Sequence, residues 1–282
     1  MTIEDIILGN DGRGISALRP HLSPNYCADA AGFAMSHPGT TLIATGFWIL
    51  SGEAVETDGP SGAVAIGRAL ESMGRLVVYV TDAQGAAVVR AAAGDSAEVV
   101  EFPHGDRAAS DADAQALVDT YAPSLLIGIE RCAPSADGVY RNMRGVDIGA
   151  HTSMVDALFH RGVPSIGIGD GGNEIGMGLL APEIAAADKL PDAPAVTSVD
   201  KLVIASVSNW GAWGLLAAMS LLMGENYLPN LPEEMARVRA CVGAGAVDGF
   251  SGDRTALVDG FDLDAYCQPL ADLRALVGVR RR

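Results

Sequence analysis

The sequence is poor in positive charge. Its 282 residues include 35 aspartates and glutamates but only 19 lysines and arginines, which gives a formal net charge of −16. A chain with this imbalance repels phosphate backbones and anionic lipid headgroups, so we do not expect it to bind nucleic acid or a membrane through bulk electrostatics. Most of the carboxylates are interpreted as a solubilising surface.

Cysteine clusters and long apolar runs are also missing. The four cysteines are far apart and form no C-x-x-C pair, which argues against a zinc site and against a disulfide framework. Residues 215–223 are apolar but too few to cross a membrane. The acidic first residues do not resemble a signal peptide. We therefore expect a cytoplasmic protein.

Short apolar segments alternate with helical segments along most of the chain. Strands are expected at 41–50, 76–80, 97–102, 124–130, 163–168 and 200–207, and turns at 247–249 and 258–260. Helices are expected at 25–36, 63–73, after the second strand to 93, at 110–121 with Ser110 as N-cap, before 159, and at 214–223, 232–242 and 262–277. This alternation predicts an α/β fold, with a mostly parallel sheet flanked by helices in three Rossmann-like layers. Residues 1–40 are expected to be an N-terminal helical extension packed on the core, and residues 41–282 to form the α/β domain.

A glycine-rich loop with two carboxylates follows the fifth expected strand. Five of the ten residues 169–178 are glycines, and the loop also holds Asp170, Asn173 and Glu174. The glycines fit the G-x-G-x-x-G dinucleotide pattern, but the two carboxylates would repel a pyrophosphate, and no Walker lysine is present. The same groups suit a hard divalent cation, which prefers oxygen ligands. We interpret the loop as a metal or polar-substrate site.

Polar side chains also follow the other expected strands. Because ligands of open α/β sheets bind beyond the carboxyl ends of the strands, these side chains are expected to share a metal or substrate pocket. They are Glu53, Glu56 and Asp58 after the first strand, Asp82 after the second, Glu130 after the fourth, Asp170 and Glu174 after the fifth, and Asn209 after the sixth. The loop 131–147 adds cationic and amide groups of the kind that bind an anion, namely Arg131, Arg141, Asn142 and Arg144.

Five motifs together resemble the D-glutamate cyclase-like family, a domain that occurs at the end of a larger mitochondrial enzyme and also alone in prokaryotes. They are ETDGP (56–60), IER (129–131), YRNMRGVDI (140–148), IGIGDGGNEIGMG (166–178) and VSNWGA (207–212), and the resemblance covers about residues 40–260. The chain departs from the family pattern at Cys132, where proline is usual, and at Leu179, where asparagine is usual. Neither change removes a carboxylate.

The resemblance implies conversion of D-glutamate to 5-oxo-D-proline with loss of water, assisted by a divalent cation such as Mn²⁺ or Mg²⁺. A cation can polarise the γ-carboxylate, a carboxylate of raised pKa can take the ammonium proton, and an arginine can hold the α-carboxylate. On this view the metal ligands are Asp170, Glu174 and Glu130; the catalytic groups are Glu130, Asp58 and Asn173; and the substrate contacts are Arg131, Arg144, Asn142, Asn209, Gly171 and Gly172.

Two other functions remain open from the sequence. One is a metal-dependent hydrolase of a phosphorylated or lactam substrate. The other is a non-enzymatic module that binds an acidic metabolite or a nucleotide. The expected partner is a small acidic amino acid. The sequence does not determine the oligomeric state and is compatible with a homo-oligomer.

Overall fold

The fold is built on one sheet of six parallel strands. The computed structural model describes residues 1–279. In sheet order the strands are β5 (Glu98–Glu101), β4 (Val77–Thr81), β1 (Thr41–Thr45), β6 (Leu125–Ile129), β7 (Ser165–Gly169) and β8 (Lys201–Ile204). Every neighbouring pair is parallel. Numbered along the chain this is the order 3-2-1-4-5-6 of Rossmann-like folds, which confirms the predicted α/β class.

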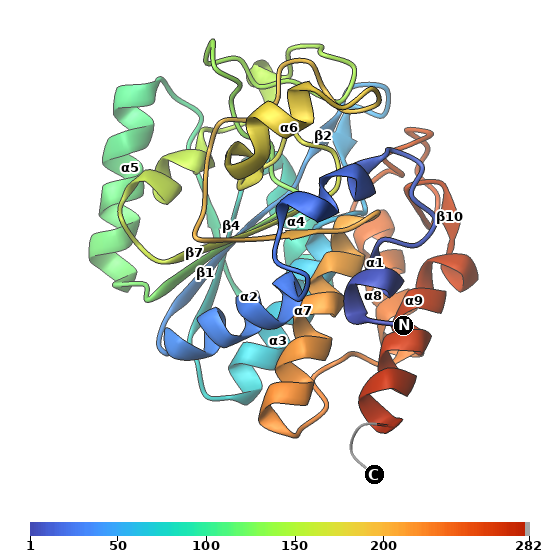
Figure 1. Cartoon of the computed structure of the whole chain (residues 1–282). Coiled ribbons are helices and arrows are strands. Elements are labelled where there is room, and N and C mark those ends of the chain that lie inside the picture. The colour runs from blue at the N-terminus through green and yellow to red at the C-terminus, as the bar shows by residue number, and fades with distance from the viewer. Residues whose placement is uncertain (280–282) are drawn as a thin grey trace.

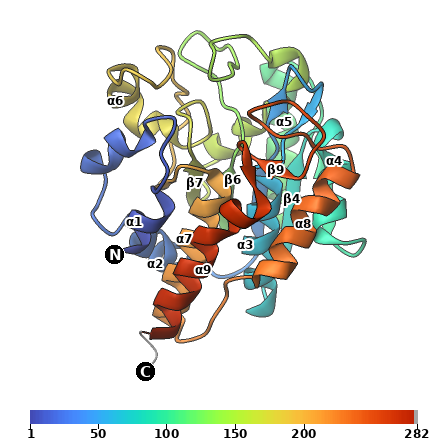
Figure 2. The same ribbon diagram turned by 90° about the vertical axis from the view of Figure 1, so that its right-hand side faces the viewer.

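Helices cover both faces of the sheet (Figure 1). On one face, α2 (Tyr26–Ser36), α7 (Ser208–Met223), α3 (Pro60–Ser72) and α4 (Ala83–Ala93) pack side by side. The other face carries α5 (Arg107–Tyr121) and the short 3-10 helix η3 (Val155–His160). Outside the first group, α8 (Leu231–Gly243) packs on α4 and α9 (Leu263–Val279) packs on α7, as Figure 2 shows from the side.

Coverage of both faces explains the composition of the strands. Every residue of β1, β4, β6 and β7 is buried, so these strands form continuous apolar segments rather than an alternation of apolar and polar residues. The edge strand β5 differs, because its two glutamates are exposed. Charge on an edge strand discourages pairing with another chain.

The expected strand 41–50 is interrupted. Gly46 has a φ of 104°, and the chain turns there after β1. The following residues form the short antiparallel hairpin of β2 (Trp48–Ile49) and β3 (Ala54–Val55). The prediction of an α-helix before residue 159 is wrong, because that segment forms two short 3-10 helices, η2 (Gly149–His151) and η3.

Helix α5 begins earlier than the sequence predicted. Its N-cap is Asp106, whose carboxylate accepts a hydrogen bond from the backbone N–H of Ala109, whereas Ser110 is buried inside the helix. The aspartate was missed because Ser110 precedes a run of acidic residues that also resembles a first turn.

The first forty residues pack against the sheet domain. They form α1 (Ile3–Ile7), the 3-10 helix η1 (Ile15–His21) and α2, and their apolar side chains join the same core as the strands. The domain boundary at residue 40 stays a prediction. The remaining elements are η4 (Met177–Leu180), α6 (Ala181–Ala185) and the antiparallel pair β9 (Leu257–Val258) and β10 (Phe261–Asp262). Across residues 1–279, no helix has both the length and the apolar character that a membrane crossing requires.

Candidate functional site

Several of the predicted carboxylates meet at the carboxyl edge of the sheet. In folds of this type, ligands bind beyond this edge where the strand order reverses, which here is between β1 and β6. Glu130 directly follows β6, Asp170 directly follows β7, and Asp58 lies between β1 and α3. All three are buried, with exposed fractions of 5%, 2% and 1%.

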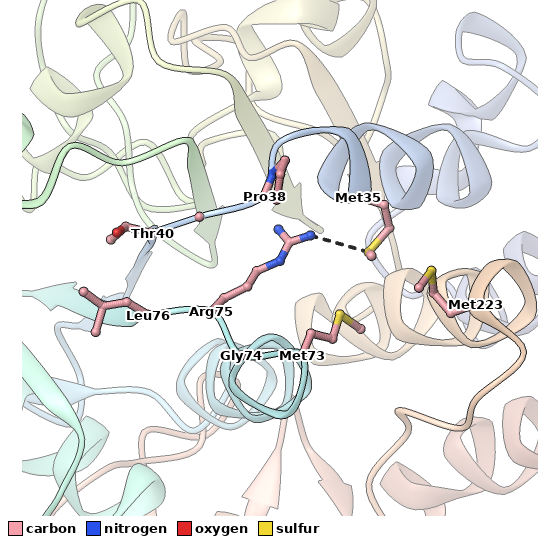
Figure 3. Close-up of a pocket in the computed structure, with 9 residues that line it drawn as sticks. Met35, Pro38, Thr40, Met73, Gly74, Arg75, Leu76 and Met223 are labelled. Carbon is pink, nitrogen blue, oxygen red and sulfur yellow. Dashed lines mark hydrogen bonds between the residues drawn. The ribbon is translucent and has the colours of Figure 1, made fainter.

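A shallow apolar depression lies at the opposite edge of the sheet (Figure 3). Three methionines and Arg75 line it, together with residues that lead into the amino ends of β1 and β4. Its lining contains no carboxylate and no nucleophilic cysteine. The chemistry therefore points to the carboxyl edge as the site.

Asp58 and Asn209 fix two helix ends to each other. The Asp58 carboxylate accepts hydrogen bonds from the backbone N–H groups of Ser208 and Asn209, both at 2.8 Å, at the start of α7. The Asn209 side-chain oxygen accepts from the N–H groups of Gly59 and Gly62, at 3.0 and 2.7 Å, at the start of α3. Each side chain thus satisfies the free N–H groups of the other segment's helix. These bonds hold the two helix ends together, and they occupy the side-chain oxygen of Asn209, whereas its amide nitrogen makes one long hydrogen bond, to the Thr57 carbonyl oxygen at 3.4 Å.

Glu130 has a strained backbone. Its φ is +42°, which is uncommon for a residue with a side chain, and its carboxylate accepts a hydrogen bond from the Ser208 hydroxyl at 2.5 Å. Strain of this kind costs about 1–3 kcal/mol and is usually found where function requires it. Burial, and then repulsion from Asp170 and Glu174, raise the pKa of Glu130 well above its usual value.

The glycine-rich loop closes on its own glutamate. The Glu174 carboxylate accepts hydrogen bonds from the backbone N–H groups of Asp170 (3.2 Å), Gly171 (2.6 Å) and Gly172 (2.7 Å). These bonds hold Asp170 in a fixed place. Both carboxylate oxygens of Glu174 already accept hydrogen bonds from the loop itself. No α-helix begins directly at this loop within the described residues, since the next element is the short 3-10 helix η4. This arrangement does not favour the dinucleotide reading of G-x-G-x-x-G.

Two glycines of the motif are required by close packing. A Cβ on Gly167 would lie 2.6 Å from the Ile175 carbonyl oxygen, because the loop folds back over β7. Gly172 has a φ of +92°, and a Cβ there would lie 2.8 Å from the Ile184 side chain. A side chain at either position would therefore strain the backbone or clash with a neighbour.

Replacing Gly172 with alanine should weaken both the fold and the site. Positive φ and the contact with Ile184 should lower the free energy of unfolding by about 1 kcal/mol or more. Asp170 and Glu174 would also shift relative to each other. The free energy of Mn²⁺ binding should therefore fall by more than the free energy of unfolding does. Gly145→Ala is a matched control, since Gly145 also has positive φ but lies in open space. Calorimetric Mn²⁺ titration and urea denaturation of both variants check this; unchanged Mn²⁺ affinity in folded Gly172→Ala would make the loop a plain turn.

Two groups of carboxylates within residues 1–279 are spaced to hold a metal ion. One is Glu130, Asp170 and Glu174, and the other is Asp58, Asp170 and Asp259; in each group one oxygen per residue lies within 4.8 Å of the others. Asp170 belongs to both. The first group is the predicted ligand set. Asp259 is new, because the sequence shows it only as part of a turn, which here joins β9 to β10.

Arg13 is a second residue that the sequence analysis missed. Its guanidinium donates two hydrogen bonds to Asp259, at 2.9 and 2.7 Å, and a third to Asp170 at 2.5 Å. Figure 1 shows the loop after α1 reaching the β10 segment on this side of the molecule. No sequence pattern around residue 13 marked it, since only the tertiary fold brings it to the carboxylates.

The electrostatics of the cluster favour a bound cation. Burial raises the pKa of Asp58 to about 7, with repulsion from Asp259 adding to it. Burial raises the pKa of Asp170 well above its usual value, although Arg13 opposes the shift. Burial and repulsion from Asp259 and Asp58 do the same to Glu56, which is 4% exposed. These donors are all carboxylate oxygens, and positive charge would relieve their repulsion, so the residues fit a hard divalent cation.

Comparison with known proteins places the chain. Residues 3–274 match the model of a family described as D-glutamate cyclase-like, C-terminal. The chain belongs to this family. It is 32% identical over 211 residues to the human protein named D-glutamate cyclase, mitochondrial; this covers 68% of the chain but only 34% of the human protein. A solved structure of an exopolyphosphatase-related protein from Bacteroides fragilis aligns with 92% of the chain and 60% of its own, with a TM-score of 0.43 and 6% identity.

In this member of the D-glutamate cyclase-like family, neither Arg131 nor Arg144 forms an ion pair, within the described residues, with a carboxylate of the two groups spaced for a metal ion. Arg131 is fully buried and forms a two-point ion pair with Asp82. It also donates to the carbonyl oxygens of Gly46 and Ser153. Arg144 is exposed, and within the described residues its side chain has no ion-pair partner. Their assignment to a substrate carboxylate stays a prediction that the geometry does not favour.

The two remaining predicted residues shape loops. The Asn142 side-chain oxygen accepts from the backbone N–H groups of Arg144 and Val146. The Asn173 side chain donates to the Arg141 carbonyl oxygen at 2.9 Å, which ties the glycine-rich loop to the loop 131–147. Cys132, where the family pattern has proline, packs in a small apolar cluster, so this departure is accommodated by packing.

Proposed function

We propose that this chain cyclises D-glutamate to 5-oxo-D-proline with loss of water, with Mn²⁺ or Mg²⁺ as cofactor. The proposal rests mainly on one observation. Two groups of three carboxylate residues share Asp170 and lie beyond the carboxyl ends of the strands, where the strand order reverses. The printed name of the human relative supports the substrate and the reaction. The relative is much longer than the matched region, so its activity is carried to this chain as part of the proposal.

The reaction requires an amine and a polarised carboxylate. The substrate nitrogen forms a bond to the carbon of the γ-carboxylate, one carbon–oxygen bond of that carboxylate breaks, and the two protons lost by the ammonium leave with that oxygen as water. A bound cation would supply Lewis-acid polarisation of the γ-carboxylate. Asp170 would hold it together with Glu130 and Glu174 on one side or Asp58 and Asp259 on the other.

The protein's own carboxylates supply the proton transfers. Glu130 is proposed to accept an ammonium proton at its second oxygen, because one oxygen is already held by Ser208. Glu56 faces the same cluster, and its carboxylate accepts no hydrogen bond within residues 1–279. A carboxylate of raised pKa is a better proton acceptor near neutral pH than an ordinary one. The backbone bonds to Asp58 keep that group fixed, which suits it to orienting rather than carrying protons.

The proposal predicts cation-dependent turnover of D-glutamate. Protein treated with a chelator should show no product, and added Mn²⁺ or Mg²⁺ should restore formation of 5-oxo-D-proline from D-glutamate. Chiral chromatography with D-glutamate, L-glutamate and 5-oxo-D-proline as separate substrates measures direction and stereochemistry. Absence of product with both cations and both enantiomers would sink the cyclase proposal; hydrolysis of the lactam alone would favour the hydrolase alternative.

A further inference from the structure

We infer that Arg13 is the anchor for the substrate's α-carboxylate, and that without a cation it lies across the carboxylates that would hold the cation. This inference rests on the proposed function. Arg13 is the one basic residue in the described part of the chain that forms an ion pair with a carboxylate of either metal-spaced group.

The position of Arg13 suits contact with both the cluster and a ligand from outside. Its side chain is 29% exposed, whereas the side chains of its partners Asp170 and Asp259 are 3% and 6% exposed. The Arg13 side chain therefore extends from the protein surface to the buried oxygens of the cluster. Arg131 cannot be reached in this way, because its side chain is fully buried against Asp82.

The backbone that carries Arg13 is fixed independently of the cluster. The Asp11 carboxylate accepts hydrogen bonds from the N–H groups of Gly14 (2.6 Å), Ile15 (3.1 Å) and Ser16 (2.9 Å). Ile15 is completely buried in the main core. A change of partner by the guanidinium consequently needs only side-chain torsions and no movement of the loop.

Competition for the same oxygens links the two roles. Arg13 bonds Oδ2 of Asp170 and both carboxylate oxygens of Asp259, and these two residues are members of the group spaced for a metal ion. A divalent cation there would take over the oxygens and leave the guanidinium with free N–H groups. A free guanidinium pairs with a carboxylate through two parallel hydrogen bonds. The α-carboxylate of glutamate is unchanged by ring closure, so it is the group that a fixed anchor can hold throughout.

The variant Arg13→Gln tests whether Arg13 binds the substrate or only stabilises the arrangement of the carboxylates. In calorimetric titrations without substrate, the variant should bind Mn²⁺ more tightly than wild type, within the range of about 5- to 150-fold usual for coupled sites. At saturating Mn²⁺ it should bind glutarate, a dicarboxylate that cannot cyclise, at least about tenfold more weakly. Arg13→Lys should not restore glutarate binding, because an ammonium cannot form the two-point pair. Arg19→Gln is the matched control, since Arg19 pairs with Asp5 on the surface, and it should match wild type in both titrations.

Opposite signs in the two titrations are the signature of the inference. Weaker Mn²⁺ binding in Arg13→Gln would show that Arg13 only braces the carboxylates, and unchanged glutarate affinity would show that it is no anchor. If Arg13→Gln does not fold, phenylglyoxal labelling of wild-type Arg13 decides: Mn²⁺ should increase labelling, and no increase overturns the inference. None of these readouts uses turnover, so a wild-type protein that fails to cyclise D-glutamate would reject the proposed function separately.

Discussion

Replacing Asp170 with asparagine should remove the proposed high-affinity binding of Mn²⁺ and with it the proposed cyclisation of D-glutamate. Asp170 is the residue common to both metal-spaced groups, so the substitution takes a charged ligand from each. Changes to residues that merely support metal ligands already lower affinity by about 10- to 100-fold, and loss of a direct ligand should cost at least about 100-fold. Calorimetric Mn²⁺ titration and the 5-oxo-D-proline assay measure the two effects.

The control for this variant is Asp188→Asn. Asp188 is exposed and belongs to neither metal-spaced group, so the same loss of charge should leave Mn²⁺ affinity and activity unchanged. Wild-type affinity in Asp170→Asn would mean that the cation binds elsewhere. A fall in both variants would reduce the effect to net charge, which is long-range and screened by salt.

Replacing Arg131 with methionine should cost stability rather than substrate affinity. The guanidinium is fully buried, pairs with Asp82 through two hydrogen bonds, and also donates to the carbonyl oxygens of Gly46, after β1, and of Ser153, between η2 and η3. Its loss leaves the Asp82 carboxylate buried without a counter-charge, for which about 3–5 kcal/mol of unfolding free energy is expected. Urea denaturation followed by circular dichroism measures the loss, and kcat/KM of the folded fraction should change little.

A double variant tests the reason for that loss. If the cost comes from the unpaired carboxylate, Asp82→Asn should be less harmful in the Arg131→Met background than in wild type. Arg131→Met alone could instead show near-normal stability and a raised KM for D-glutamate. That result would support the prediction from the sequence that Arg131 binds the substrate.

The sequence by itself determined the six strands of the main sheet and the glycine-rich loop. Apolar segments separated by helices predict a parallel sheet because strands covered on both faces must be apolar throughout. The loop 170–174 could also be predicted as a built site, because Glu174 bonds backbone groups only two to four residues away. Interactions between residues so close along the chain can be predicted from a short stretch of sequence. The motifs that identified the family lie at the same strand ends, and the family match confirmed that identification.

The tertiary structure alone decided which side chains share the site. Arg13 and Asp170 are 157 residues apart, and Arg13 and Asp259 are 246 apart, so no local pattern could pair them. Glu130 and Arg131 are neighbours, yet Glu130 contacts Ser208 of α7 while Arg131 contacts Asp82 after β4. The strand order β5-β4-β1-β6-β7-β8 sets these partners, because it fixes which strand ends are adjacent. A residue's type and neighbours indicate what chemistry it can perform, but the packing of the sheet determines which groups it meets.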